Sequence, residues 1–148
     1  MVVVLTPLLS LLLILARVHA DGIRGLGHWA LGNLSISIGM LIMMMQFSST
    51  YFAILPATTL YALGLGLFLN GTQAFTEKRP TYGVTALIVG LVIVIDAYFL
   101  WQQDFRTIVV CNAMIFMVVN IFGARMLLVP VKPPLRTAYW FTGFMFCL

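Results

Sequence analysis

The stretch TYGVTALIVGLVIVIDAYFLW, from Thr81 to Trp101, carries a single charged side chain, Asp96, in an otherwise apolar run. At a rise of about 1.5 Å per residue, a helix of this length crosses a hydrocarbon core of roughly 30 Å. The stretch therefore predicts a helix that spans a lipid bilayer.

Similar apolar runs occur on both sides of it, at 2–18, 27–46, 51–75, 107–128 and 138–148. All but the last are about 17 to 25 residues long, which suits a full crossing. The last would rise only about 16 Å, so it is either re-entrant or cut short. We expect an all-α fold, a polytopic transmembrane helix bundle with five full spans and a truncated sixth. The chain is then one membrane domain, 1–148, and a fragment of a longer protein.

The overall composition agrees with this prediction. Of the 148 residues, 62% are apolar and 8% are charged, and the mean hydropathy is +1.08. Soluble domains carry about 25% charged residues, so lipid must be the solvent for most of this surface. The net charge of +4 does not indicate nucleic-acid binding, because no basic run is longer than Lys78-Arg79.

The basic residues predict an orientation. The ends of the first, third and fifth runs and the segments after them share one side of the membrane. This side contains Arg17, Arg24, Lys78, Arg79, Arg125, Lys132 and Arg136. The opposite side has only Arg106. By the positive-inside rule the basic side is cytoplasmic, so the N-terminus is outside. Val18-His19-Ala20 resembles a signal-peptide cleavage site. However, Arg17 lies at the end of the apolar run rather than before its start, which favours an uncleaved helix.

Asp96 is the one acidic residue well inside an apolar run, and an ionisable group at that depth is a candidate functional site. It lies about 7.5 Å along the helix axis from the interface at Trp101. Two interpretations remain open. Asp96 is either hydrated near the interface or paired with Arg106, or it contacts a ligand or relays protons.

Amide and small side chains are the other features of the apolar runs. Asn112 and Asn120 share a helix face, and Asn33 and Asn70 lie in other runs. They are predicted either to bond between helices or to line a ligand pocket. Pairs of small residues four apart predict close helix packing: Ser35 with Gly39, Ala62 with Gly66, and Ala86 with Gly90.

The remaining candidates carry weaker signals. Met40, Met43, Met44, Met45, Met114 and Met117 are soft potential copper ligands, but His28 lies at the far end of its run, so packing is expected instead. His28 and His19 flank the first loop and are candidates for a ligand or pH contact. Cys111 and Cys147 are expected to be buried thiols rather than a disulfide. We find no catalytic motif and expect no cofactor and no metal site.

The segment Gly25-Leu26-Gly27-His28-Trp29-Ala30-Leu31-Gly32-Asn33 opens the second run. Gly39, the stretch from Leu60 to Gly71, Phe75 and the basic turn Lys78-Arg79 follow it. The fifth run is preceded by Arg106 and ends in Ala124-Arg125-Met126-Leu127-Leu128. This order resembles the N-terminal multi-helix membrane region of bacterial GGDEF-type diguanylate cyclases, and related regions precede histidine kinases.

This resemblance implies a sensory or anchoring input domain that passes a change in helix packing to a cytoplasmic effector domain. The chain contains no GGDEF motif, and it has His28 where such regions often have a second Trp. No catalytic residue is carried over. The resemblance therefore implies an input domain without its catalytic partner, in contact with the lipid of a bacterial inner membrane. A homodimer is left open. A small transporter or channel subunit, or a membrane scaffold, is the alternative.

Overall fold

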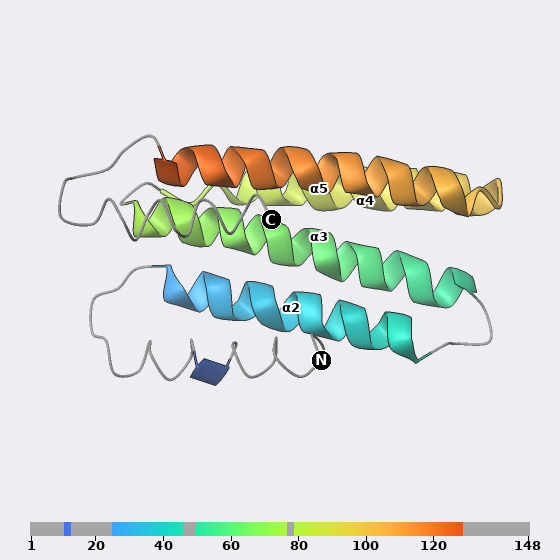
Figure 1. The fold of residues 1–148 in the computed structure, drawn as a ribbon, viewed down its shortest axis with the longest axis horizontal. Coiled ribbons are helices and arrows are strands. Elements are labelled where there is room, and N and C mark those ends of the chain that lie inside the picture. The colour runs from blue at the N-terminus through green and yellow to red at the C-terminus, as the bar shows by residue number, and fades with distance from the viewer. Residues whose placement is uncertain (1–10, 13–24, 46–49, 77–78, 129–148) are drawn as a thin grey trace.

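The structure is a computed structural model that describes residues 11–12, 25–45, 50–76 and 79–128. Apart from residues 11–12, its helices are α2 (Leu26–Met44), α3 (Thr50–Phe75), α4 (Tyr82–Trp101) and α5 (Phe105–Leu128) (Figure 1). Each of the four contains a stretch that is long and apolar enough to cross a membrane. The described residues include no strand, so the all-α prediction is confirmed for them.

The predicted number of spans is not supported. The four helices match the runs predicted at 27–46, 51–75, 81–101 and 107–128 to within a few residues at each end. The runs at 2–18 and 138–148 lie outside the described residues. The structure therefore establishes four helices of membrane length, rather than five spans with a truncated sixth.

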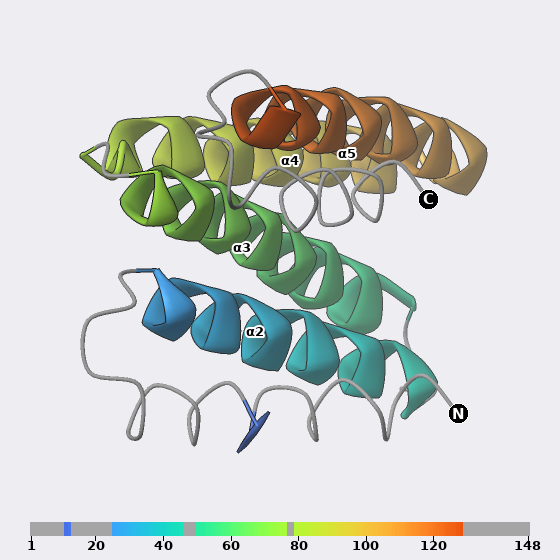
Figure 2. The ribbon, with the colours of Figure 1, turned by 60° about the vertical axis from the view of Figure 1, so that its left-hand side comes forward.

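Helix α3 is the centre of the arrangement. It packs against α2, α4 and α5, and α4 also packs against α5. Figure 2 shows α2 on one side of α3 and the pair α4 and α5 on the other. Consecutive helices run antiparallel, so α2 and α4 end where α3 and α5 begin. We call that end of the bundle the Trp101 end and the opposite end the Trp29 end.

A seam of small residues brings α2 and α3 together. It consists of Gly25, Gly32 and Gly39 before and within α2, and of Ala57, Gly64 and Gly71 on α3, each spaced by seven residues. A Cβ atom on Gly32 would lie 2.9 Å from the Gly64 carbonyl oxygen, and one on Gly39 would lie 2.8 Å from that of Ala57. The backbones can approach this closely because no side chain intervenes, as is common between membrane helices.

Trp29 closes the seam at the Trp29 end. Its indole Nε1 donates a hydrogen bond to the Phe68 carbonyl oxygen at 3.2 Å. Its ring lies against Phe75, with the ring centroids 5.4 Å apart. A Cβ atom on Gly71 would collide with the indole. The quoted motif around Trp29 and the distant Gly71 and Phe75 are thus parts of one packing arrangement.

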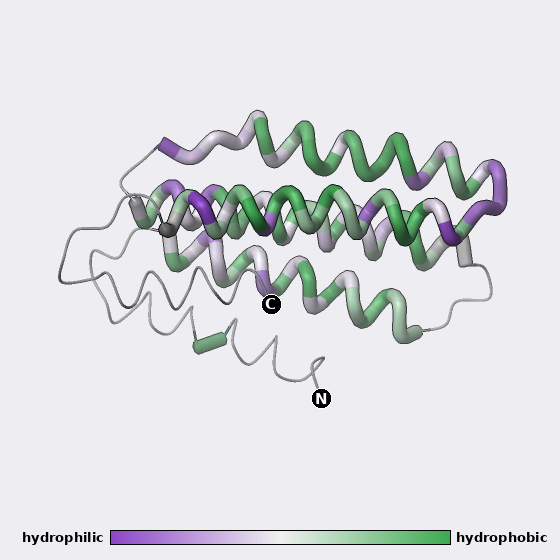
Figure 3. Tube along the Cα trace, turned by 45° about the horizontal axis from the view of Figure 1, so that its top comes forward, coloured by the Kyte–Doolittle hydropathy of each residue, from purple (hydrophilic) through white to green (hydrophobic). Residues whose placement is uncertain are grey.

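The outward surface of the helices is apolar. Large exposed apolar side chains on α4 and α5 include Leu87, Val94, Val109, Met114, Met117 and Val118. Figure 3 shows hydrophobic residues along the middle of α5 and hydrophilic ones at the turn between α4 and α5. Side chains of this kind suit contact with the hydrocarbon of a bilayer.

Candidate functional site

Asp96 lies on the buried face of α4. The buried residues of this helix are Thr85, Ile88, Val92, Asp96 and Leu100. Their spacing of three, four, four and four residues places them on one stripe of the helix. The surface of Asp96 is 0% exposed, so its carboxylate is enclosed by protein.

Two helices supply partners to this carboxylate. Thr58 of α3 contacts Oδ2 of Asp96 through its hydroxyl. From α5, the side-chain Nδ2 of Asn112 donates a hydrogen bond to Oδ1 at 2.8 Å. We call Thr58, Asp96 and Asn112 the Asp96 cluster. It joins three helices near the Trp101 end.

The first interpretation of Asp96, in which it is hydrated near the interface or paired with Arg106, is therefore wrong. The residue is fully buried rather than hydrated at the interface. Arg106 is exposed, and the hydrogen bonds of the carboxylate go to Thr58 and Asn112 instead. The prediction failed because it considered only distance along α4, whereas α3 and α5 cover this face.

Thr58 also bonds to its own helix. Its Oγ1 lies 2.8 Å from the carbonyl oxygen of Ile54 and 3.2 Å from that of Leu55. Such back-bonding to the preceding turn is common for threonine inside helices. Thr58 therefore connects the Asp96 carboxylate to the backbone of α3.

Asn112 has one group without a partner. The residue is 4% exposed, and its Oδ1 is buried with no hydrogen bond in the described part of the chain. Because a buried acceptor without a donor costs free energy, the cluster is not fully satisfied in this arrangement.

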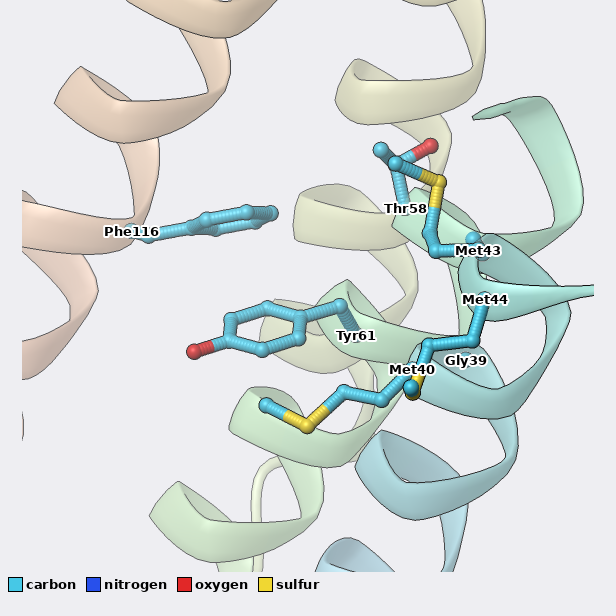
Figure 4. A pocket seen from close by; sticks show the side chains of 8 residues that line it. Gly39, Met40, Met43, Met44, Thr58, Tyr61 and Phe116 are labelled. Carbon is cyan, nitrogen blue, oxygen red and sulfur yellow. The ribbon is translucent and has the colours of Figure 1, made fainter. Parts of the chain in front are cut away.

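An apolar pocket adjoins the cluster. Its volume is about 430 Å³, and its lining is formed by Gly39, Met40, Met43, Met44, Ala57, Thr58, Tyr61 and Phe116. In Figure 4 the rings of Tyr61 and Phe116 lie beside each other and the methionines approach from α2. The two ring centroids are 4.9 Å apart. Thr58 belongs to both the pocket wall and the Asp96 cluster, so it links the two.

A second polar group lies nearer the Trp29 end. Asn70 Nδ2 donates to Thr85 Oγ1 at 2.9 Å, and Thr85 Oγ1 donates to the Gly66 carbonyl oxygen at 3.1 Å. Gly66 provides the room for this contact, because a Cβ atom there would collide with Thr85. Gln73 Oε1 accepts a hydrogen bond from the backbone N–H of Thr81 at 2.6 Å, just before α4.

Apolar side chains separate the two polar groups. The core cluster between them consists of Ala62, Leu65, Leu69, Ile88, Val92 and Val119. Thr85 and Asp96 are eleven residues apart on α4, which is about 16 Å along the axis. Within the described residues, no continuous line of polar side chains runs through the bundle.

The other predicted amide and histidine residues lie apart from the cluster. Asn120 is half-buried and two turns of α5 away from Asn112, and Asn33 is buried on α2. Neither side chain has a hydrogen bond in the described part of the chain. His28 Nε2 lies 3.0 Å from the hydroxyl of Tyr82 at the Trp29 end. Of the amide and histidine residues that the sequence singled out, only Asn112 contacts Asp96 within the described residues.

Of the three predicted packing pairs, two lie in contacts between helices and one does not. Ser35 donates to the Leu60 carbonyl oxygen at 2.8 Å, and Gly39 lies against Ala57. Ala62 is fully buried in the core cluster, one turn from Gly66. Ala86 and Gly90 are exposed, and a Cβ on Gly90 would meet nothing within 4 Å. The expected packing of this last pair is wrong for the described helices, because it lies on the outward face of α4.

The sulfur-containing residues show no common site. Met40, Met43 and Met44 line the pocket, and Met43 and Met44 are also exposed, as are Met45, Met114 and Met117. Cys111 is a free, half-buried thiol, and Cys147 and His19 lie outside the described residues. The described residues contain no group of three or more His, Cys, Asp or Glu side chains that could hold a metal ion.

Two features of the structure were not predicted from the sequence: the role of Thr58 and the seam between α2 and α3. Thr58 gave no signal, because threonine is frequent in membrane helices and its partner is 38 residues away. The seam between α2 and α3 did have a signal in the sequence, the seven-residue spacing of Gly25, Gly32 and Gly39. The search for pairs four apart did not look for that period.

Comparison with known proteins adds no family to these observations: no family model, no curated protein and no solved structure matches the chain.

Proposed function

We propose that this chain is a membrane-embedded sensory or anchoring input domain of a bacterial signalling protein, with a diguanylate cyclase as the parent protein. In this proposal it lies in the inner membrane with its N-terminus outside, and a cytoplasmic effector domain is its partner. The proposal draws on the resemblance of the segment around Trp29, Gly71 and Phe75 to such input regions.

The observation that carries the proposal is the Asp96 cluster beside the pocket. A single carboxylate is bonded to α3 and α5 from α4, and Thr58 is shared with the pocket wall. A ligand in the pocket, or a change at the carboxylate, would alter the contacts among three helices. An input domain needs such a coupling, because a signal acts by favouring one helix arrangement over another.

The second candidate is a transporter or channel subunit. Asp96 and Asn112 favour it, since buried polar side chains often line ion pathways. The apolar core cluster of Ala62, Leu65, Leu69, Ile88, Val92 and Val119 argues against it within the described bundle, because it separates the two polar groups. A scaffold role would need neither the cluster nor the pocket.

The test expresses the intact gene in a strain that lacks it, as wild type and as Thr58→Val, Asp96→Asn and Asn120→Ala variants. Asn120→Ala is the control, because that side chain has no hydrogen bond among the described residues. Cellular cyclic dinucleotide should change severalfold for Thr58→Val and Asp96→Asn and stay at the wild-type level for the control.

A parallel assay measures proton and sodium flux into vesicles that contain the purified chain. The proposal expects no flux above empty vesicles. If flux depends on Asp96 and the variants leave the cellular level of cyclic dinucleotide unchanged, the transporter function would replace the signalling proposal. No response in either assay would favour a scaffold. The chain alone, incubated with GTP and Mg²⁺, should form no cyclic dinucleotide, because it lacks a phosphate-binding loop and a carboxylate cluster for Mg²⁺.

A further inference from the structure

The Asp96 carboxylate has no cationic partner among the described residues. The titratable or charged residues on the three helices that form the cluster, outside the cluster itself, are Tyr51, Tyr61, Tyr82, Tyr98, Arg106, Cys111 and Arg125. Its bonds go instead to the neutral groups of Thr58 and Asn112. An isolated carboxylate removed from water is costly, so such a group is normally neutralised by a proton or paired with a cation.

The donors and acceptors around Asp96 discriminate between an ionised and a protonated carboxyl. The Thr58 hydroxyl has one hydrogen, yet it lies within bonding distance of three acceptor groups, the carbonyls of Ile54 and Leu55 and the Asp96 carboxyl. A carbonyl can only accept. If the carboxyl is ionised, the carboxylate and the backbone carbonyls compete for the single hydroxyl hydrogen of Thr58. If the carboxyl is protonated, it can donate to Thr58 Oγ1, and the Thr58 hydrogen remains available to the backbone, which gives a chain of hydrogen bonds.

That chain runs in a single direction. Asn112 Nδ2 donates to Asp96 Oδ1, the protonated Oδ2 donates to Thr58 Oγ1, and the Thr58 hydroxyl donates to the Ile54 carbonyl at 2.8 Å. A half-turn of the Asn112 amide would place its unpartnered Oδ1 against the carboxyl. Only a protonated carboxyl could then donate to it, because an ionised carboxylate has no hydrogen.

We infer that Asp96 is a reversible proton-binding site within the membrane bundle and that it holds its proton in the arrangement described. Loss of the proton would turn the Thr58 hydroxyl from the Ile54 carbonyl to the carboxylate. It would also place a negative charge behind the wall of the apolar pocket. Proton binding is thereby linked to the pocket through Thr58. This inference rests on the cluster geometry and does not depend on the signalling role proposed above.

The experiment uses the full chain in lipid nanodiscs and infrared spectroscopy of carbon-13-labelled aspartate. The chain has three aspartates, Asp21, Asp96 and Asp104. The double variant Asp21→Asn/Asp104→Asn leaves Asp96 as the only labelled side chain and does not alter the cluster. We expect an isotope-sensitive band of a protonated carboxylic acid at neutral pH. The band should be lost in alkali and return when neutral pH is restored.

Two further variants test the hydrogen-bond chain. In the same background, Thr58→Val removes the acceptor of the Asp96 proton, so the band should shift to higher frequency, whereas Thr58→Ser should keep the original position. A labelled side chain that shows only carboxylate bands at neutral pH would overturn the inference. Carboxylate bands that shift on addition of sodium chloride but not of potassium chloride would show that the site binds a metal cation instead of a proton. A band unchanged by Thr58→Val would also contradict the proposed chain.

Discussion

The side-chain amide of Asn112 on α5 donates a hydrogen bond to the carboxyl group of Asp96 on α4 across 2.8 Å. Both residues are buried, and the bond joins two helices that are neighbours in the chain. The contribution of this bond to the free energy of unfolding can be measured, because Asn120 on the same helix provides a matched control.

Replacing Asn112 by alanine should destabilise the bundle. The change removes a buried donor from Asp96, and such a loss costs about 1 to 2 kcal/mol. Asn120→Ala is the control, because Asn120 is half-buried and makes no hydrogen bond among the described residues. Reversible unfolding in detergent and denaturant measures the difference. Equal stabilities for the two variants would mean that the bond to Asp96 makes no net contribution.

Bulky substitutions at the packing glycines should also weaken the fold. In Gly39→Leu the new side chain would meet the Ala57 backbone, and in Gly66→Leu it would meet Thr85. Overpacking of this kind costs about 1 to 3 kcal/mol. The melting temperature in detergent should fall for both variants.

Gly90→Leu is the matched control for these two variants, since a Cβ there meets nothing within 4 Å. It should leave the melting temperature unchanged or raise it, because leucine favours helix more than glycine does. If Gly39→Leu and Gly66→Leu melted like Gly90→Leu, the glycines would not be required for close packing.

Asp104 should make the stability of the bundle depend on pH in the acidic range. It precedes α5, and its carboxylate accepts hydrogen bonds from the Thr107 hydroxyl at 2.5 Å and from the Thr107 backbone N–H at 3.2 Å. The bonds from Thr107 lower the pKa of Asp104 below its ordinary value. The ionised form is therefore favoured in the folded state, and its stabilisation is present above the ordinary carboxyl pKa and lost as pH falls through the lowered one.

The measurement compares melting temperatures of the wild type and Asp104→Asn as the solution is acidified from neutral pH. Asparagine can cap the helix without titrating, so the difference between the two proteins isolates Asp104. The advantage of the wild type should shrink on acidification. A difference that stays constant with pH would contradict the role of the carboxylate.

Accessibility labelling tests the predicted orientation. In a background with Cys111→Ser and Cys147→Ser, single cysteines are placed at Gln102 and at Arg79, which are both exposed and lie at opposite ends of the bundle. From the seven-to-one division of basic residues, an impermeant thiol reagent outside intact cells should modify Gln102→Cys but not Arg79→Cys. The reverse pattern would invert the topology.

Much of the fold follows from local sequence. Four apolar runs became four helices with ends within a few residues of the predicted ones, because run length against bilayer thickness is a local property. The sequence also singled out Asp96 and Asn112, since polar side chains stand out in apolar runs. It could not pair them, because helix rotation and neighbour choice depend on packing between segments.

The tertiary structure decided which faces meet. Thr58 joins Asp96 because α3 crosses α4 at that height, and Ala86 and Gly90 face outward because the stripe of Asp96 and Val92 faces inward. Composition alone determined that the chain is helical and apolar enough for a membrane, since every backbone group in lipid must find an internal partner. The burial of a lone carboxyl beside an apolar pocket depended on three helices packing together, which no single segment specifies.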